Sequence, residues 1–107
     1  MNRFRVRLTP EAEEDIRNSF EWGDRVWGRP AAEKWVRAIH KAIFGRLTNF
    51  PFSCPLAPET ADLSFEIRQL LISRYRVLFE IRPMEVVVLH VYGQHSGNLK
   101  DDADDAE

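Results

Sequence analysis

Three side chains in the C-terminal third of the chain have types suited to acid–base chemistry on a phosphate ester. Arg76 supplies a fixed positive charge, and Tyr92 and His95 supply groups that can hold or move a proton. Metal-independent cleavage of RNA needs a base at the 2′-hydroxyl, an acid at the leaving oxygen and cations for the extra phosphate charge. Side chains of these three types could supply such groups. The alternative for His95 is a solvated loop residue, because a lone histidine near glycine in a loop is usually solvated.

The sequence does not indicate a metal site or a bound cofactor. His90 and His95 lie five residues apart without a third ligand, and Cys54 is the one cysteine. A structural zinc site needs four ligands, and a single cysteine cannot form a disulfide within the chain. A glycine-rich phosphate loop is also missing. We therefore expect neither a metal ion nor another cofactor.

The net charge of −2 over 107 residues hides two regions of opposite sign. Residues 100–107 sum to −4 and have little to bury, so we expect a disordered acidic tail. Residues 1–99 sum to +2 and are expected to form a single globular domain. An apolar run long enough for a membrane span or a signal peptide is missing, and the low cysteine content favours a cytoplasmic location.

The first half of the chain predicts one strand and two helices. Residues 4–8 alternate between apolar and charged side chains, which indicates a strand with one buried face. Thr9 and Pro10 then suit the N-cap and the first position of a helix. Apolar residues continue at helical spacing to residue 47 with a break at 28–30, which predicts an antiparallel helical hairpin. The charges on the exposed helix faces balance, so we expect these faces, with His40, to be solvated.

The second half predicts three strands. Three prolines in residues 49–58 exclude a helix interior or a central strand, and we expect an ordered loop. Runs rich in apolar residues follow at 65–72, 75–81 and 86–92, separated by short turns, and predict an antiparallel meander. The predicted fold class is therefore α+β: an N-terminal strand, a two-helix antiparallel hairpin and a three-strand meander, with the helices packed on one face of a four-stranded sheet.

Alternation within these strands assigns one face of the sheet to the core. The residues expected there are Phe4, Val6 and Leu8, then Phe65, Ile67, Gln69 and Leu71, then Tyr75, Val77, Phe79 and Ile81, and finally Val87, Leu89 and Val91. The opposite face then collects the candidate binding residues Arg5, Arg7, Arg68, Arg76, His90 and Tyr92. Basic and aromatic side chains on a sheet suit RNA, and they suit an acidic or amphipathic protein partner equally well. The alternative is a solvated face on which arginines pair with Glu66 and Glu80.

This order of elements resembles the RelE/ParE superfamily of small toxins from bacterial type II toxin–antitoxin systems, which includes plasmid stabilisation proteins. The similarity rests on residues 7–16, 35–51, 55–56, 66–70, 75–81 and 86–91, taken in this order. It implies a toxin domain over residues 1–99 and a cognate antitoxin whose extended or helical segment wraps it. The assemblies expected are a homodimer or a heterotetramer with the antitoxin.

Members of this superfamily either cleave messenger RNA on the ribosome or inhibit DNA gyrase. Arg76 matches the strand arginine of the cleaving members, whereas no lysine lies between Lys41 and Lys100, where those members carry theirs. The resemblance therefore favours a ParE-like toxin that acts by binding, with gyrase as the target it implies. Two alternatives stay open: a metal-independent endoribonuclease that uses Arg76, His95 and Tyr92, and a degenerate toxin kept as a regulatory or interaction module.

Overall fold

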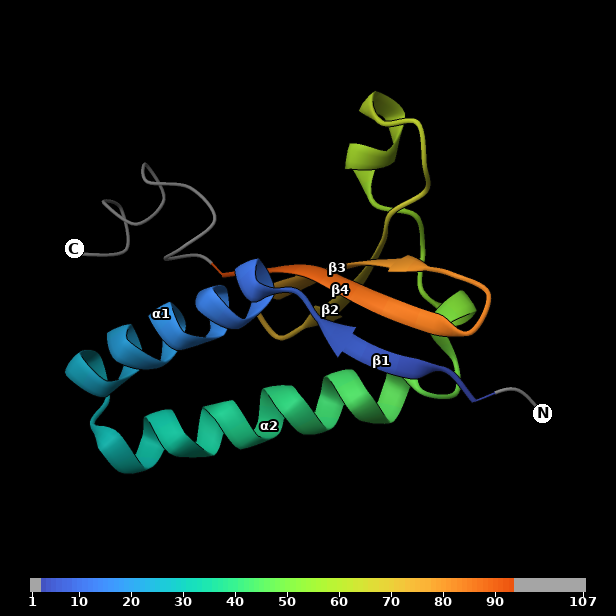
Figure 1. Cartoon of the computed structure of the whole chain (residues 1–107). Coiled ribbons are helices and arrows are strands. Elements are labelled where there is room, and N and C mark those ends of the chain that lie inside the picture. The colour runs from blue at the N-terminus through green and yellow to red at the C-terminus, as the bar shows by residue number, and fades with distance from the viewer. Residues whose placement is uncertain (1–2, 94–107) are drawn as a thin grey trace.

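One strand and two helices precede three further strands along the chain (Figure 1). The computed structural model describes residues 3–93, so residues 94–99 of the predicted domain and the acidic tail lie outside the described residues. The predicted α+β class and order of elements are confirmed. The elements are β1 (Arg5–Leu8), α1 (Pro10–Val26), α2 (Arg29–Leu47), β2 (Arg68–Ile72), β3 (Tyr75–Ile81) and β4 (Glu85–Tyr92), with the short 3-10 helices η1 (Pro51–Ser53) and η2 (Pro58–Asp62) between α2 and β2.

The four strands form one mixed sheet in the order β1-β4-β3-β2. The strands β2, β3 and β4 make the antiparallel meander, and β1 adds to its edge parallel to β4. Parallel neighbours need a long crossover connection, which the helical hairpin supplies together with the loop and meander that follow it. Within the described residues β1 pairs with β4 alone, so its other edge faces outward.

The helical hairpin starts and turns where the sequence predicts. The Thr9 hydroxyl accepts a hydrogen bond from the Ala12 amide (3.1 Å), which satisfies one of the donors left open at a helix start. Gly28 joins the two helices with φ of +100°, a backbone conformation that a side chain would strain. The hairpin covers one face of the sheet, and the segment that carries η2 stands on the opposite side (Figure 1).

The main core lies between the hairpin and the inner face of the sheet. Ile39 and Ile43 of α2 pack there with Phe79 of β3, and each of these side chains is at most 1% exposed. The core face predicted for the first and third strands is confirmed, since all of their expected residues belong to this cluster or pack against it: Phe4, Val6, Leu8, Tyr75, Val77, Phe79 and Ile81.

The face predicted for the second strand is wrong. Leu70 and Ile72 pack on the main core, because they lie opposite Val77 and Tyr75 of β3. Both alternating sets of this segment contain apolar residues, so the pairing with β3 is what decides between them. Of the residues expected inside, Phe65 is exposed ahead of the strand, Leu71 is exposed, Gln69 contacts Arg76 on the outer face and Ile67 is buried in a separate small cluster.

A β-bulge in β4 explains the second wrong assignment. Leu78 of β3 lies opposite His90. The next residue, Phe79, already lies opposite Val88, so Leu89 is an extra residue in β4. A bulge shifts the alternation by one position, which strict period two cannot anticipate. The residues of β4 in the main core are therefore Val86, Val88 and Val91, in place of Val87, Leu89 and Val91.

Because Tyr75 of β3 is buried, we expect the free energy of unfolding to fall in alkaline solution. Tyr75 packs against Trp35, and burial raises the pKa of its hydroxyl to about 12. An unfolded tyrosine loses its proton near pH 10, so between about pH 10 and 12 the unfolded state binds fewer protons and stability falls as pH rises. We expect a loss of about 1.4 kcal/mol at pH 11 relative to pH 9 in urea unfolding. Tyr75→Phe should lose less over this interval, and an equal loss in both proteins would contradict the assignment.

Candidate functional site

The chain itself covers part of the outer face of the sheet, which is the face away from the helices. Ala57 and Ile67 of the loop pack on Leu78 of β3, with Leu89 and Tyr92 of β4 beside them. Hydrogen bonds close this loop, because the Ala57 amide donates to the Ile67 carbonyl at 2.7 Å. The buried Leu78 is therefore accounted for within the chain, without an outside partner.

Three of the six predicted binding residues come together on this outer face. Arg76 lies opposite Tyr92 in the β3–β4 pair, and the His90 ring stacks on the Tyr92 ring with centroids 5.0 Å apart. Arg76 also donates to a carboxylate oxygen of Glu59 (2.8 Å) and to the amide oxygen of Gln69 (2.9 Å). We refer to these five side chains as the outer-face cluster: Glu59, Gln69, Arg76, His90 and Tyr92.

Asp15 of α1 fixes one end of the outer-face cluster. One of its carboxylate oxygens lies 3.1 Å from Nδ1 of His90 and accepts a hydrogen bond from the Val91 amide at 2.9 Å. This contact leaves Nε2 as the nitrogen of His90 that is able to exchange a proton with a ligand. A histidine oriented by a carboxylate beside a tyrosine hydroxyl and a guanidinium could perform general acid–base chemistry.

The charges of the outer-face cluster largely offset one another. The Arg76 guanidinium holds the pKa of the Glu59 carboxyl below its ordinary value, mainly through their hydrogen bond. Burial raises the pKa of the Tyr92 hydroxyl, and the nearby charge of Asp15 adds to this effect. Arg76 thus has a carboxylate partner already, and Tyr92 keeps its proton at neutral pH.

Loss of the Asp15 carboxylate is expected to destabilise the fold. Asp15→Ala leaves the amide of the buried Val91 without its hydrogen-bond acceptor, and an unsatisfied buried donor costs about 1–3 kcal/mol. Asp15→Asn keeps an oxygen at this place and should lose less. Urea unfolding at pH 7 measures both. Equal free energies of unfolding for Asp15→Ala and the unchanged protein would show that this hydrogen bond does not stabilise the fold.

Arg68 does not join the outer-face cluster, so its predicted place is wrong. It lies opposite Phe79 of β3 and therefore on the inner face, as the reversed alternation of β2 requires. Its guanidinium donates to the Cys54 carbonyl at 2.7 Å and lies over the Phe52 ring, 5.4 Å from the ring centroid. We assign it a structural role that ties the loop to the sheet.

The remaining predicted residues are scattered. Arg5 and Arg7 are exposed on β1, and Arg7 donates to the Glu85 carboxylate at 2.8 Å. His95 lies outside the described residues, so the structure leaves the set of Arg76, His95 and Tyr92 untested. Within residues 3–93, His90 is the histidine beside Tyr92.

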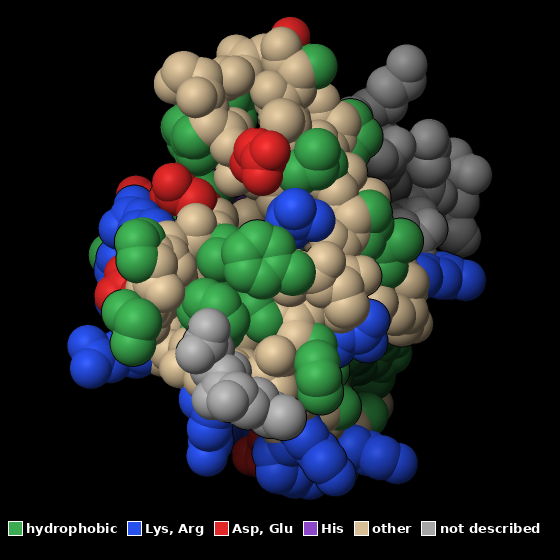
Figure 2. All heavy atoms as spheres, turned by 90° about the vertical axis from the view of Figure 1, so that its right-hand side faces the viewer, with side chains coloured by type: hydrophobic (Ala, Val, Ile, Leu, Met, Phe, Trp, Pro, Cys, Tyr) green, Lys and Arg blue, Asp and Glu red, His purple; other side chains and the backbone are tan. Residues whose placement is uncertain are grey.

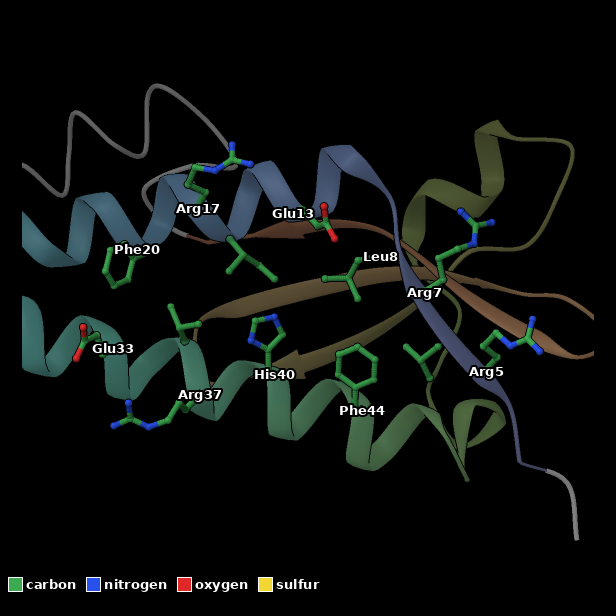
Figure 3. A pocket seen from close by; sticks show the side chains of 13 residues that line it. Arg5, Arg7, Leu8, Glu13, Arg17, Phe20, Glu33, Arg37, His40 and Phe44 are labelled. Atoms are coloured by element: carbon green, nitrogen blue, oxygen red, sulfur yellow. The ribbon is translucent and has the colours of Figure 1, made fainter.

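A groove of about 930 Å³ runs between α1, α2 and β1, on the side of the helices (Figure 3). Strand β1 contributes residues of both its faces to the lining. The apolar lining comes from all three elements: Val6, Leu8, Ile16, Phe20, Val36 and Phe44. The charged lining residues are Arg5, Arg7, Glu13, Arg17, Glu33 and Arg37, and His40 lies between the two helices (Figure 3).

The sequence did not predict this groove, because the balanced charges on the exposed helix faces indicated an ordinary solvated surface. The groove residues of α2 follow helical spacing at positions 33, 36, 37, 40 and 44, beside the core stripe of the same helix. Val36 and Phe44 were the available signal, because neither belongs to the core cluster and Phe44 is 39% exposed. The expectation that these helix faces are solvated, with His40 among them, stays a prediction; the sequence did not show that their apolar residues line a groove.

The lining of the groove carries an excess of positive charge. Four arginines face two glutamates there. Arg7 pairs with Glu85 and Arg17 pairs with Glu14. Within residues 3–93, Arg5 and Arg37 form no ion pair. Apolar walls under unpaired arginines suit an amphipathic segment that carries acidic side chains.

The end of the molecule at which β1 begins also exposes hydrophobic side chains, next to arginines (Figure 2). Phe50 and Phe52 are 58% and 63% exposed there, and neither lines the groove. These exposed phenylalanines can serve as controls for substitutions of the groove phenylalanines, because they have the same side chain but lie outside the groove.

Residues 3–93 do not form a metal site, a reactive cysteine site or a membrane-spanning helix. Among residues 3–93, no three His, Cys, Asp or Glu side chains gather as ligands for a metal ion. Cys54 is buried, and burial raises the pKa of its thiol, which disfavours the reactive thiolate. Over the same range, every helix is too short or too polar to cross a membrane.

The fold defines a class: a small α+β protein whose helical hairpin and edge strand frame a groove beside a mixed sheet. The chain belongs to the ParE toxins of type II toxin–antitoxin systems, since the family "ParE toxin of type II toxin-antitoxin system, parDE" matches residues 6–96. None of the curated proteins matches the chain.

Two solved structures share this fold. A chain of the chromosomal ParDE toxin–antitoxin system of P. aeruginosa aligns with a TM-score of 0.71 at 15% identity, covering 84% of this chain and 95% of that one. A chain of the RelBE2 toxin–antitoxin complex of Mycobacterium tuberculosis aligns with a TM-score of 0.64 at 24% identity, covering 87% and 93%. Similarity at this level of identity establishes the fold.

Proposed function

We propose that this ParE-family protein inhibits growth by binding a target in the cytoplasm, and that a cognate antitoxin neutralises it by docking in the groove. The observation that carries the second part is the groove itself, which combines apolar side chains with four arginines and lies beside the edge strand β1. A helical segment could bury an apolar face there, and an extended segment could pair with β1.

Binding is favoured over RNA cleavage as the mode of action. Arg76, the residue that would stabilise a phosphate in the transition state, is already bonded to Glu59 and Gln69. Lysine is also missing between positions 41 and 100, where the cleaving relatives carry theirs. The family resemblance makes DNA gyrase the proposed target.

Expression of the chain alone in bacteria tests this proposal. We expect growth arrest, with inhibition of supercoiling by the purified protein, and rescue when the neighbouring small reading frame is expressed too. Normal growth at high expression, without effect on supercoiling, would overturn the toxin function. If that harmless protein still bound the neighbouring product, the degenerate regulatory module would be the better description.

A second candidate function is a ribosome-dependent, metal-independent endoribonuclease. The observation in its favour is His90, which Asp15 orients beside Tyr92 and diagonally across the strands from Arg76. Transcript sequencing after induction separates the two functions. Cleavage that is lost in Arg76→Ala and in His90→Ala would favour the nuclease, with His95→Ala as the test of the residue predicted from sequence. Arrest without cut transcripts would leave binding as the mode of action.

A further inference from the structure

His40 is the imidazole in the lining of a groove whose other residues are apolar, arginine or glutamate. We propose that the segment docking there is acidic and places a carboxylate on His40, so that His40 and Arg37 together select the partner. This inference rests on the proposed function, because the docking segment is taken to belong to the antitoxin. Beyond the proposed function, the docking segment must carry an acidic side chain at the position that meets His40.

The surroundings of His40 make a polar partner necessary once the groove is filled. Its ring lies near the Phe44 ring, 6.2 Å between centroids, with Leu8 and Val36 also in the lining. Within residues 3–93 the His40 ring forms no hydrogen bond, so its nitrogens depend on water while the groove is open. A docked apolar segment would remove that water, and an imidazole buried without a partner is costly.

The charged side chains that line the groove favour a carboxylate over a cation or a neutral apolar group as the partner of His40. Strand β1 contributes Arg5 and Arg7, α1 contributes Glu13 and Arg17, and α2 contributes Glu33 and Arg37. Two of these arginines, Arg5 and Arg37, form no ion pair within residues 3–93, so their charges are available to attract an anion. Arg37 lies one turn before His40 on the same helix and forms no ion pair within residues 3–93. Arg37 points away from His40 in Figure 3, and a turn of its long side chain in the complex would let one carboxylate bridge the two residues.

A carboxylate on His40 makes docking depend on pH. Histidine titrates near pH 6.5, whereas an exposed carboxyl is charged throughout the range from pH 6 to pH 8. Protonation of His40 strengthens its contact with the carboxylate, so the complex binds a proton more tightly than the separate proteins do. By linkage, affinity then rises as pH falls from 8 to 6.

Titration calorimetry with the purified full-length chain and the purified product of the neighbouring small reading frame tests the inference. We expect about tenfold tighter binding at pH 6 than at pH 8, the value of one charge-assisted hydrogen bond. His40→Gln keeps polar contact but cannot be protonated, so it should bind with equal affinity at both pH values. Lys41→Gln, at an exposed neighbouring position outside the groove, should keep the pH dependence.

The outcomes separate this inference from the function on which it rests. Strong binding that is independent of pH, or unchanged or tighter binding by His40→Phe, would overturn the acidic contact and leave the toxin–antitoxin function intact. No binding by the unchanged chain at either pH, together with no rescue of growth, would overturn both. Urea unfolding of each variant confirms that the loss of affinity does not come from loss of the fold.

Discussion

Phe44→Gln is expected to weaken antitoxin binding by about 50-fold while the protein stays folded. Phe44 lines the groove and is 39% exposed, so part of its surface is open to a partner while the rest packs within the free chain, and urea unfolding must show that the variant stays folded. In the complex the ring would be covered, and burial of an aromatic side chain contributes about 2–3 kcal/mol to binding at the centre of an interface. Glutamine is a good helix former, so α2 should persist. Calorimetry with the neighbouring gene product measures the difference.

Phe50→Gln is the matched control for this substitution. Phe50 follows the end of α2, is 58% exposed and lies outside the groove lining. The same change of side chain there should alter affinity by less than about threefold, because its ring would stay in water in the complex. An equal loss of affinity in both variants would place the antitoxin elsewhere, and so would no loss in either.

Phe79→Ala is expected to reduce the free energy of unfolding by about 3–5 kcal/mol. Phe79 is fully buried in β3, within the cluster that joins both helices to the sheet. Truncation removes the transfer energy of the ring and leaves a cavity that neighbouring side chains cannot fill. A domain of this size is stable by about 5–15 kcal/mol, so the change removes a large share of the total.

Urea unfolding followed by circular dichroism measures this loss, with Phe50→Ala as the comparison. The exposed Phe50 should change stability by less than about 0.5 kcal/mol. A loss below about 1 kcal/mol in Phe79→Ala would mean that β3 does not form the centre of the core. Because the expected loss is global, Phe79→Ala should also lower the yield of folded toxin and any growth arrest that it causes.

Local signals in the sequence predicted most of the fold. Thr9 and Pro10 mark the start of α1 through a side-chain cap and a fixed backbone angle, both of which depend on neighbouring residues alone. The faces of β2 and β4 depend on pairing between strands. The extra residue Leu89 in β4 reverses the alternation at a point that the apolar run from Val86 to Val91 does not mark.

The candidate site was less accessible to sequence reasoning. Arg76 and Tyr92 were correctly expected on one face, because the third strand and the end of the fourth were assigned correctly. Glu59, the partner of Arg76, and Asp15, the partner of His90, come from distant segments, and no periodicity links those segments to the strands. The groove requires knowledge of how α1 and α2 cross β1, since each element contributes a few apolar residues that look incidental in the sequence.

Hydrogen exchange of the purified complex tests most directly whether an antitoxin occupies the groove. Amides of β1, of the groove-facing turns of α1 and of α2 around His40 should exchange more slowly in the complex than in the chain alone. The amides of β2 and β3 should exchange at the same rate in the complex and in the chain alone. Protection confined to β2, β3 and the loop around η2, with β1 and the helices unchanged, would contradict docking in the groove and assign the antitoxin to the outer face of the sheet.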